Sequence, residues 1–231
     1  MRKIEIAGIP FAVDNKQEFT EWVWHGHETD EDALFTVSAT EEEIHNEAER
    51  LNHEVDSSGC ESNCLYRKVA LKMLDYDGFL LHSAVVALNG EAYVFTAPGG
   101  TGKSTHANYW LREFAGKAYI LNGDKPIIRK IDGKFYACGT PWRGKERLGV
   151  AENVPLKAVC LLERGTENRI VKATSDEMID TLFNQVLLPD DTEQIIKQLD
   201  LLNQLVREVP VYRLKCNMSQ EAAVVAYNGM K

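Results

Sequence analysis

The chain has 231 residues and a formal net charge of −9, and its 44% hydrophobic and 26% charged residues are typical of a soluble globular protein with one large domain, or one medium domain and a small accessory piece. No apolar run approaches the roughly 20 residues of a membrane helix, and the N-terminus lacks the apolar stretch of a secretory signal, so we expect neither a membrane protein nor a secreted one. Five cysteines, an odd number in a chain long enough to build a core, indicate reduced thiols in a cytoplasmic protein rather than a disulfide framework.

Charge is distributed unevenly along the chain. Residues 1–63 carry 16 acidic residues against 4 Lys and Arg, whereas residues 64–231 carry 19 against 22. Because so acidic a segment repels a phosphate backbone, we expect no nucleic-acid partner. The change also predicts a division of the chain into an acidic N-terminal accessory segment, residues 1–63, and a main domain, residues 64–231.

The first segment shows only short structural signals. Apolar residues alternate over 4–13, which predicts short strands, and residues 41–51 are typical of a helix. The polar, turn-rich run over 56–63 predicts a loop or linker.

From residue 65 the pattern is clearer. Apolar residues recur at helical spacing over 65–74, and Asp77-Gly78 predicts the end of that helix. Two pairs of apolar runs, over 84–95 and 127–138, are joined by Asn-Gly and Asp-Gly, which predicts two β-hairpins. Further strands are expected over 119–121, 156–162 and 209–214, and helices over 107–114, 174–187 and 191–206.

A glycine-rich loop lies between the second strand of the first hairpin and the helix after it. Its sequence is Ala97-Pro98-Gly99-Gly100-Thr101-Gly102-Lys103-Ser104-Thr105. A strand, a turn ending in Gly-Lys-Ser and an amphipathic helix are the context of the Walker A phosphate-binding loop, or P-loop. Its backbone N–H groups and the helix N-terminus attract phosphate oxygens, so we expect residues 99–105 to bind a nucleoside triphosphate. The sequence departs from the Walker A pattern at Ala97, where that pattern has glycine. The alternative to a phosphate-binding loop is a plain glycine-rich turn that precedes a helix.

Two side chains of this loop have expected roles in binding ATP with Mg2+. Lys103 reaches the outer phosphates as a point charge, and the Ser104 hydroxyl holds the metal ion.

The loop and its surroundings resemble the HPr kinase/phosphorylase family and its smaller relatives, whose core is shared with phosphoenolpyruvate carboxykinases. As in that family, His82 precedes the hairpin that leads into the loop, Asp124 ends the next strand, and Arg143-Gly144 stands where the family has an Arg-Gly signature. The resemblance covers about residues 80–215. It implies an α/β fold with a mixed, largely antiparallel sheet and a P-loop core.

The chain also departs from that family. Two adjacent acids usually follow the strand, whereas this chain has Gly123 and then Asp124. The residues around Arg143 differ as well, so HPr itself is not the expected acceptor.

We expect catalytic roles for Lys103 and for three residues outside the loop. Asp124 accepts the proton of the acceptor or contacts Mg2+, His82 contacts the transferring phosphate or Asp124, and Arg143 stabilises charge on the γ-phosphate. Each of the three has a structural alternative: a turn residue, a hydrogen-bonded core histidine and a solvated basic loop, respectively.

These features predict a kinase that transfers the γ-phosphate of ATP to a hydroxyl, such as the serine of a peptide, a protein or a free amino acid. A nucleotide-binding regulatory module with little catalysis is the alternative, as is a phosphatase or phosphorylase of the same fold. The spacings of His25, His27, Cys60 and Cys64 are not those of a zinc site. The choice between ATP and GTP, and between a monomer and a homo-oligomer, stays open.

Overall fold

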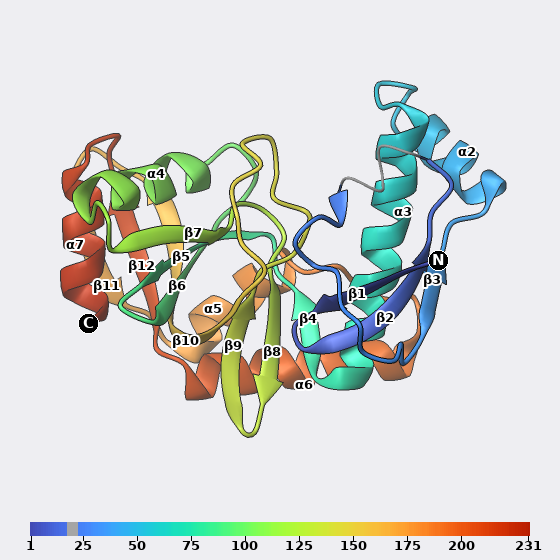
Figure 1. The fold of residues 1–231 in the computed structure, drawn as a ribbon. Helices are drawn as coiled ribbons and strands as arrows, with labels where there is room; N and C mark the ends of the chain where they lie inside the picture. Colours follow the sequence, from blue (N-terminus) through green and yellow to red (C-terminus); the bar gives the residue numbers. More distant parts are fainter. Residues whose placement is uncertain (18–22) are drawn as a thin grey trace.

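The computed structural model describes residues 1–17 and 23–231, which form two sheets with helices packed against them (Figure 1). The elements in chain order are β1 (Arg2–Ile6), β2 (Ile9–Asp14), β3 (Thr36–Ser38), α2 (Glu41–Arg50), α3 (Ser57–Lys72), a 3₁₀ turn (Met73–Tyr76), β4 (Gly78–Leu80), β5 (Ser83–Leu88), β6 (Glu91–Thr96), α4 (Lys103–Glu113), β7 (Ala118–Asn122), β8 (Ile127–Ile131), β9 (Lys134–Cys138), β10 (Asn153–Arg164), β11 (Arg169–Lys172), α5 (Ser175–Phe183), α6 (Thr192–Glu208), β12 (Val211–Cys216) and α7 (Glu221–Met230).

The small sheet has the order β1-β2-β3 and is built by the N-terminal part of the chain. The predicted strands over residues 4–13 are confirmed, and they form an antiparallel hairpin around Ala7-Gly8, both with positive φ. Helix α2 is also confirmed. It begins with a capping box in which the Thr40 hydroxyl accepts from the Glu43 N–H, and the Glu43 carboxylate accepts from the Thr40 N–H.

The loop predicted over residues 56–63 is wrong, because these residues form the first half of α3. Asp56 caps the helix by accepting from the Gly59 N–H at 2.8 Å. The side chains of Cys60 and Cys64 are buried in the core. This packing outweighs the weak helix propensity of the Ser-Ser-Gly sequence at the start of α3. The expected boundary between residues 63 and 64 thus falls inside one continuous helix.

The large sheet has the order β4-β8-β9-β10-β6-β5-β7, and β12 and β11 extend it from β10. Both predicted hairpins are confirmed, with left-handed residues at Asn89-Gly90 and Asp132-Gly133 as two-residue turns require. The sheet combines antiparallel pairs with the parallel pairs β6–β10 and β10–β12. The fold is therefore mixed α/β, as expected.

Helices cover both faces of this sheet. Helices α4 and α7 pack on one face through Ala107, Trp110 and Ala223, and α5 and α6 pack on the other through Leu182 and Leu202. Helix α5 is shorter than the predicted 174–187, since it ends at Phe183, and α7 and the short strands β3, β4 and β11 have no counterpart among the predictions. Within the described ranges, no helix is both long and apolar enough to cross a membrane.

The large sheet brings four strand ends to one edge. β10 runs parallel to β6 and β12, and β5 is antiparallel to both β6 and β7, so β6, β7, β10 and β12 all point the same way. The loops after these strands therefore meet at one edge, which is where ligands bind in sheets with parallel strands. The glycine-rich loop follows β6 and Asp124 follows β7.

Candidate functional site

The glycine-rich loop connects β6 to α4, as predicted. Gly100 and Gly102 have φ of +75° and +119°, which side chains rarely adopt, and an added Cβ at Gly99 would meet no atom within 4 Å. The Thr101 hydroxyl donates to the Pro98 carbonyl at 2.9 Å and closes the turn. Lys103 to Thr105 then form the first turn of α4, so the N-terminus of this helix faces the loop.

Lys103 is held inside the loop. Its side chain is only 8% exposed, and Nζ donates to the Ala97 carbonyl at 2.7 Å and the Pro98 carbonyl at 3.5 Å. Burial lowers the pKa of Lys103, while the negative charge of Asp124 acts in the opposite direction. The ammonium group is therefore held against the carbonyl groups at the start of the loop.

Ser104 and Asp124 line one cavity of about 330 Å³, which we call the Ser104 cavity. Arg143 to Glu146 also line it, as do Ala84, Ala107 and Ile120. A hydroxyl, a carboxylate and phosphate oxygens are the kind of donor set that Mg2+ takes together with water, so these residues fit the ion. Among residues 1–17 and 23–231, no three His, Cys, Asp or Glu side chains gather as a metal site by themselves.

Asp124 is paired with two cationic or polar neighbours. Its Oδ2 lies 2.5 Å from Lys125 Nζ, and its Oδ1 lies 3.3 Å from His82 Nε2. Burial alone would raise the pKa of Asp124, but the His82 and Lys125 contacts outweigh burial and lower the pKa from 3.8 to about 2. The group is a carboxylate at any ordinary pH.

A buried turn, which the sequence reasoning missed, positions Asp124. The Asn122 side chain accepts from the N–H groups of Asp124 and Lys125, and it donates to the carbonyl and hydroxyl of Thr140. The Thr140 hydroxyl in turn donates to the Lys125 carbonyl at 2.7 Å. The Asn-Gly-Asp turn was visible in the sequence, but its partner Thr140 is 18 residues away.

Two glycines allow the loop with Arg143 to lie directly against Asp124. A Cβ at Gly144, whose φ is +73°, would stand 2.9 Å from the Asp124 Cβ. A Cβ at Gly123 would stand 2.8 Å from the Arg143 carbonyl oxygen. The space for a second acid after β7 is thus filled by the Arg143 backbone, which accounts for the departure at Gly123.

Arg143 lies between the Ser104 cavity and the N-terminal part of the chain. It is half-buried, and burial lowers its pKa. Its Nη2 lies 3.4 Å from His27 Nε2, and its Nε has no partner within the described residues. Burial also lowers the pKa of His27 to about 4, so the ring is neutral near pH 7 and can accept from Arg143.

Residues on either side of Arg143 connect its loop to α4, α3 and the N-terminal part of the chain. Glu146 accepts from the Asn108 amide of α4 at 3.0 Å. Trp142 is 8% exposed, donates to the Ser62 hydroxyl at 3.3 Å and packs edge-to-face on Trp24. These contacts fix the position of Arg143 relative to α4 and α3.

A second cavity, of about 380 Å³, lies on the Thr105 side of the glycine-rich loop at the ends of β10 and β12. Two buried polar atoms of its lining residues, His106 Nδ1 and Asn217 Oδ1, have no partner in the described part of the chain. Arg164 also lines it and donates to the Gly100 carbonyl. Arg164 and Asn217 were not predicted, because only the strand order brings the ends of β10 and β12 beside the loop, whereas His106 lies on α4 directly after the loop.

The structure thus places Lys103, Ser104, Asp124, His82 and Arg143 at one edge of the large sheet, while Thr105 faces the second cavity. A family model described as SynChlorMet cassette protein ScmC matches residues 60–222, and since this is more than half of the chain, the chain belongs to that family. No curated protein sequence matches it. Among solved structures, the HPr(Ser) kinase/phosphatase from Coxiella burnetii is similar over 64% of this chain and 94% of that one, at 7% identity and a TM-score of 0.38, which is a distant structural relation.

Proposed function

We propose that this protein is an ATP-dependent kinase that transfers the γ-phosphate to a hydroxyl, with Mg2+ as cofactor. The observation that carries the proposal is the Ser104 cavity, where a helix N-terminus, a hydroxyl, a carboxylate and an arginine meet beside a buried lysine. Phosphoryl transfer requires positioned charge around the phosphates and a group near the acceptor hydroxyl, and this set of residues can supply both.

The two cavities beside the loop support one direction for the nucleotide. Ser104 and Asp124 line one cavity and Thr105 lines the other, so the γ-phosphate belongs on the Ser104 side and the nucleoside on the Thr105 side. His106 Nδ1 and Asn217 Oδ1 support this assignment, because unpartnered buried polar atoms are costly until a ligand satisfies them. A base and ribose offer such partners.

In this proposal the tasks are divided among four side chains, and Asp124 serves both the metal ion and the acceptor. Lys103 exchanges its carbonyl contacts for phosphate oxygens. Ser104, together with Asp124, would hold Mg2+, and the ion would supply positive charge beside the phosphates. Arg143 donates to the equatorial oxygens of the transferring group. The acceptor oxygen forms a bond to the γ-phosphorus as the bond to the bridging oxygen breaks, ADP leaves, and the hydroxyl proton passes to Asp124.

Asp124 is a weak base, since its pKa is about 2. In a loose transition state, however, the acceptor proton becomes acidic only as the new P–O bond forms, so a weak base in the right place is sufficient. We therefore place the contribution of Asp124 as a base at the low end of the range for such groups, about 10²-fold in rate.

The low pKa also favours a second candidate, a nucleotide-responsive binding module in which Asp124 only pairs with His82 and Lys125. A phosphatase or phosphorylase would use the same residues with water or phosphate as the attacking group.

Transfer of label from γ-labelled ATP separates these candidates. We expect Asp124→Asn to reduce transfer about 10²-fold while the Kd for ATP stays within a few-fold, because the amide keeps the size but accepts no proton. His82→Ala should reduce transfer less, since its ring contacts Asp124 and not the loop. Asp132→Asn, at the tip of the β8–β9 hairpin, is the matched control. ATP binding without transfer to any hydroxyl compound would refute the kinase and leave the binding module.

A further inference from the structure

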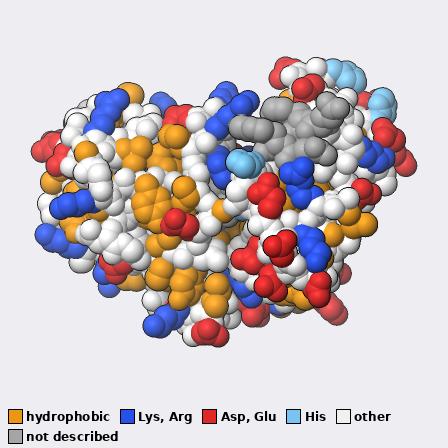
Figure 2. Space-filling model, viewed as in Figure 1, with side chains coloured by type: hydrophobic (Ala, Val, Ile, Leu, Met, Phe, Trp, Pro, Cys, Tyr) orange, Lys and Arg blue, Asp and Glu red, His pale blue; other side chains and the backbone are white. Residues whose placement is uncertain are grey.

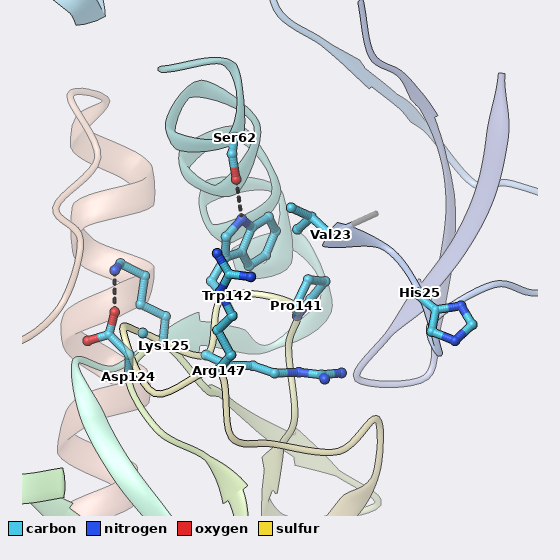
Figure 3. Close-up of a pocket in the computed structure, with 10 residues that line it drawn as sticks. Val23, His25, Ser62, Asp124, Lys125, Pro141, Trp142 and Arg147 are labelled. Atoms are coloured by element: carbon cyan, nitrogen blue, oxygen red, sulfur yellow. Dashed lines mark hydrogen bonds and ion pairs between the residues drawn. The ribbon is translucent and has the colours of Figure 1, made fainter. Parts of the chain in front are cut away.

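The cavity on the Thr105 side of the loop is separate from the cavities around Asp124. Asp124 lines the Ser104 cavity and also a third cavity, of about 290 Å³, where it pairs with Lys125 (Figure 3). The cavity of about 380 Å³ on the Thr105 side, which we call the Thr105 cavity, shares no lining residue with either of these. A group bound there is therefore kept apart from the carboxylate on which the proposed transfer depends.

His106 carries a buried N–H donor that lacks a partner. The residue lines the Thr105 cavity and is 3% exposed. The Trp110 indole, which can only donate, donates to His106 Nε2 at 3.0 Å, so Nε2 carries no proton. Burial lowers the pKa of His106 to about 4, so the ring is neutral near pH 7 and its one N–H is at Nδ1. Nδ1 has no hydrogen-bond partner in the described part of the chain.

Asn217 contributes an acceptor to the same cavity. Its side-chain nitrogen donates to the Thr166 carbonyl at 3.3 Å, and this contact fixes which end of the amide is the oxygen. Oδ1 is buried and has no partner among the described residues. The Thr105 cavity is thus lined by one unpaired donor and one unpaired acceptor, and each is costly to bury until a ligand satisfies it.

A pair of sugar hydroxyls matches this donor and acceptor. Each hydroxyl both donates and accepts, so one can accept from His106 while its neighbour donates to Asn217. His106 directly follows Thr105 on α4, and Gly100 and Gly102 of the loop line the same cavity. In a nucleotide the sugar is joined to the phosphates that such a loop holds, so it is the part that comes next to this histidine.

The outer part of the Thr105 cavity suits the base. Tyr109 and Met218 line it, and the Tyr109 hydroxyl is already used, because it donates to the Met218 carbonyl at 2.9 Å. Met218 is 83% exposed, which places it at the surface of the cavity. An aromatic and an apolar side chain can pack against the face of a base without reading its edge.

We propose that the Thr105 cavity binds the sugar of the nucleotide through its hydroxyls, and that His106 and Asn217 make the protein select ribonucleotides over deoxyribonucleotides. This inference rests on the proposed function, of which it uses only the binding of ATP at the loop. A deoxyribonucleotide would leave the buried N–H or the buried oxygen unpaired, and a site built to bind a hydroxyl discriminates against an analogue that lacks it.

Calorimetry of the parent protein with sugar analogues tests the inference. ATP, 2′-dATP, 3′-dATP and 2′,3′-dideoxy-ATP are titrated with Mg2+ in the absence of an acceptor, and ITP serves as the probe with an altered base. We expect 2′,3′-dideoxy-ATP to bind at least about tenfold more weakly than ATP, because both buried polar groups then stay unpaired. Equal affinity for these two nucleotides would overturn the inference. If ITP alone binds weakly, the two atoms read the base, and the inference is wrong.

Variants assign the effect to the two residues. In Asn217→Ala and in His106→Phe, the ratio of the Kd values for 2′,3′-dideoxy-ATP and ATP should fall toward unity, because ATP loses contacts that the analogue never made. In Asn203→Ala, an exposed change on α6, the ratio should equal that of the parent. The ratio is the readout because His106→Phe also removes the acceptor of the Trp110 indole, which affects stability. An unchanged ratio in Asn217→Ala, which leaves that contact intact, would contradict the assignment.

The two proposals fail in different ways. If ATP binds but the sugar hydroxyls make no difference, the inference fails alone. If ATP does not bind at all, the proposed function fails together with it.

Discussion

At the scale of single residues, Gly123 and Gly144 set what the site can contain. The two glycines lie in loops that pack closely against each other. A Cβ at either position would lie less than 3.0 Å from an atom of the other loop. Related sequences were expected to carry a second acid where this chain has Gly123. Here the Arg143 carbonyl takes that place, so the chain has one carboxylate and a tightly docked arginine loop.

Gly123→Ala tests this packing. The added methyl would collide with the Arg143 carbonyl, and overpacking of this kind costs about 1–3 kcal/mol, so we expect the melting temperature and the rate of transfer both to fall. Gly99→Ala is the control for stability, because its Cβ meets nothing within 4 Å. Thermal denaturation of both variants makes the comparison. A Gly123→Ala protein as stable as the parent would show that the loop does not dock on Gly123.

Residue-level prediction from the sequence was strongest where the chemistry is local. The Gly-Lys-Ser run identified Lys103 and Ser104, and turn and motif signals identified Asp124, His82 and Arg143, which the structure places at one edge of the sheet. Their catalytic roles stay predictions. Thr140, Arg164 and Asn217 carry no local signal, because their contacts depend on strand order and loop docking.

At the scale of elements, a buried carboxylate joins α2 to α3. Glu47 is 3% exposed and accepts hydrogen bonds from Arg50, Arg67 and Asn63. The Arg50 hydrogen bonds, followed by those of Arg67, lower the pKa of Glu47 from 4.5 to about 2. The folded state therefore holds the charged form more strongly than the unfolded state does.

Glu47→Gln should destabilise the protein by about 1–3 kcal/mol at pH 7, because the side chain loses charge-assisted hydrogen bonds from two arginines that are themselves partly exposed. Because the folded pKa is below the unfolded one, this contribution is complete above pH 4.5 and is lost as the pH falls toward 2. Glu49→Gln, an exposed change on the same helix, is the matched control. Urea unfolding at pH 7 and pH 3 gives both values. A gap between parent and Glu47→Gln that is as large at pH 3 as at pH 7 would contradict the assignment.

Element prediction succeeded where turns and periodicity were explicit. Asn89-Gly90 and Asp132-Gly133 fixed two hairpins and their registers. The start of α3 was missed because its polar face resembles a linker and only tertiary packing reveals the buried face. Helix α7 was missed as well. It packs by small residues, Ala222, Ala223 and Ala226, which give little periodic contrast.

At the scale of the whole molecule, the N-terminal sheet and the large sheet pair no strands with each other in the described ranges, yet they share a core. Strands β1 and β2 pack with α3 and with Leu80, Ile127 and Trp142 of the main part. Arg129 also donates to the Ala7 carbonyl at 2.7 Å. Acidic side chains gather over the N-terminal part, on the right in Figure 2. The N-terminal part therefore packs against the main part through a shared hydrophobic core.

Calorimetry of a Lys103 variant tests whether the loop before α4 binds the phosphates of ATP. Lys103→Ala should weaken ATP binding with Mg2+ at least about tenfold, because a charge-assisted contact to phosphate is lost. It should leave the protein folded, since the buried ammonium only contacts loop carbonyls. Lys117→Ala, at an exposed lysine beyond the same helix, should bind as the parent does. If Lys103→Ala binds ATP as tightly as the parent, the phosphate site is not at this loop.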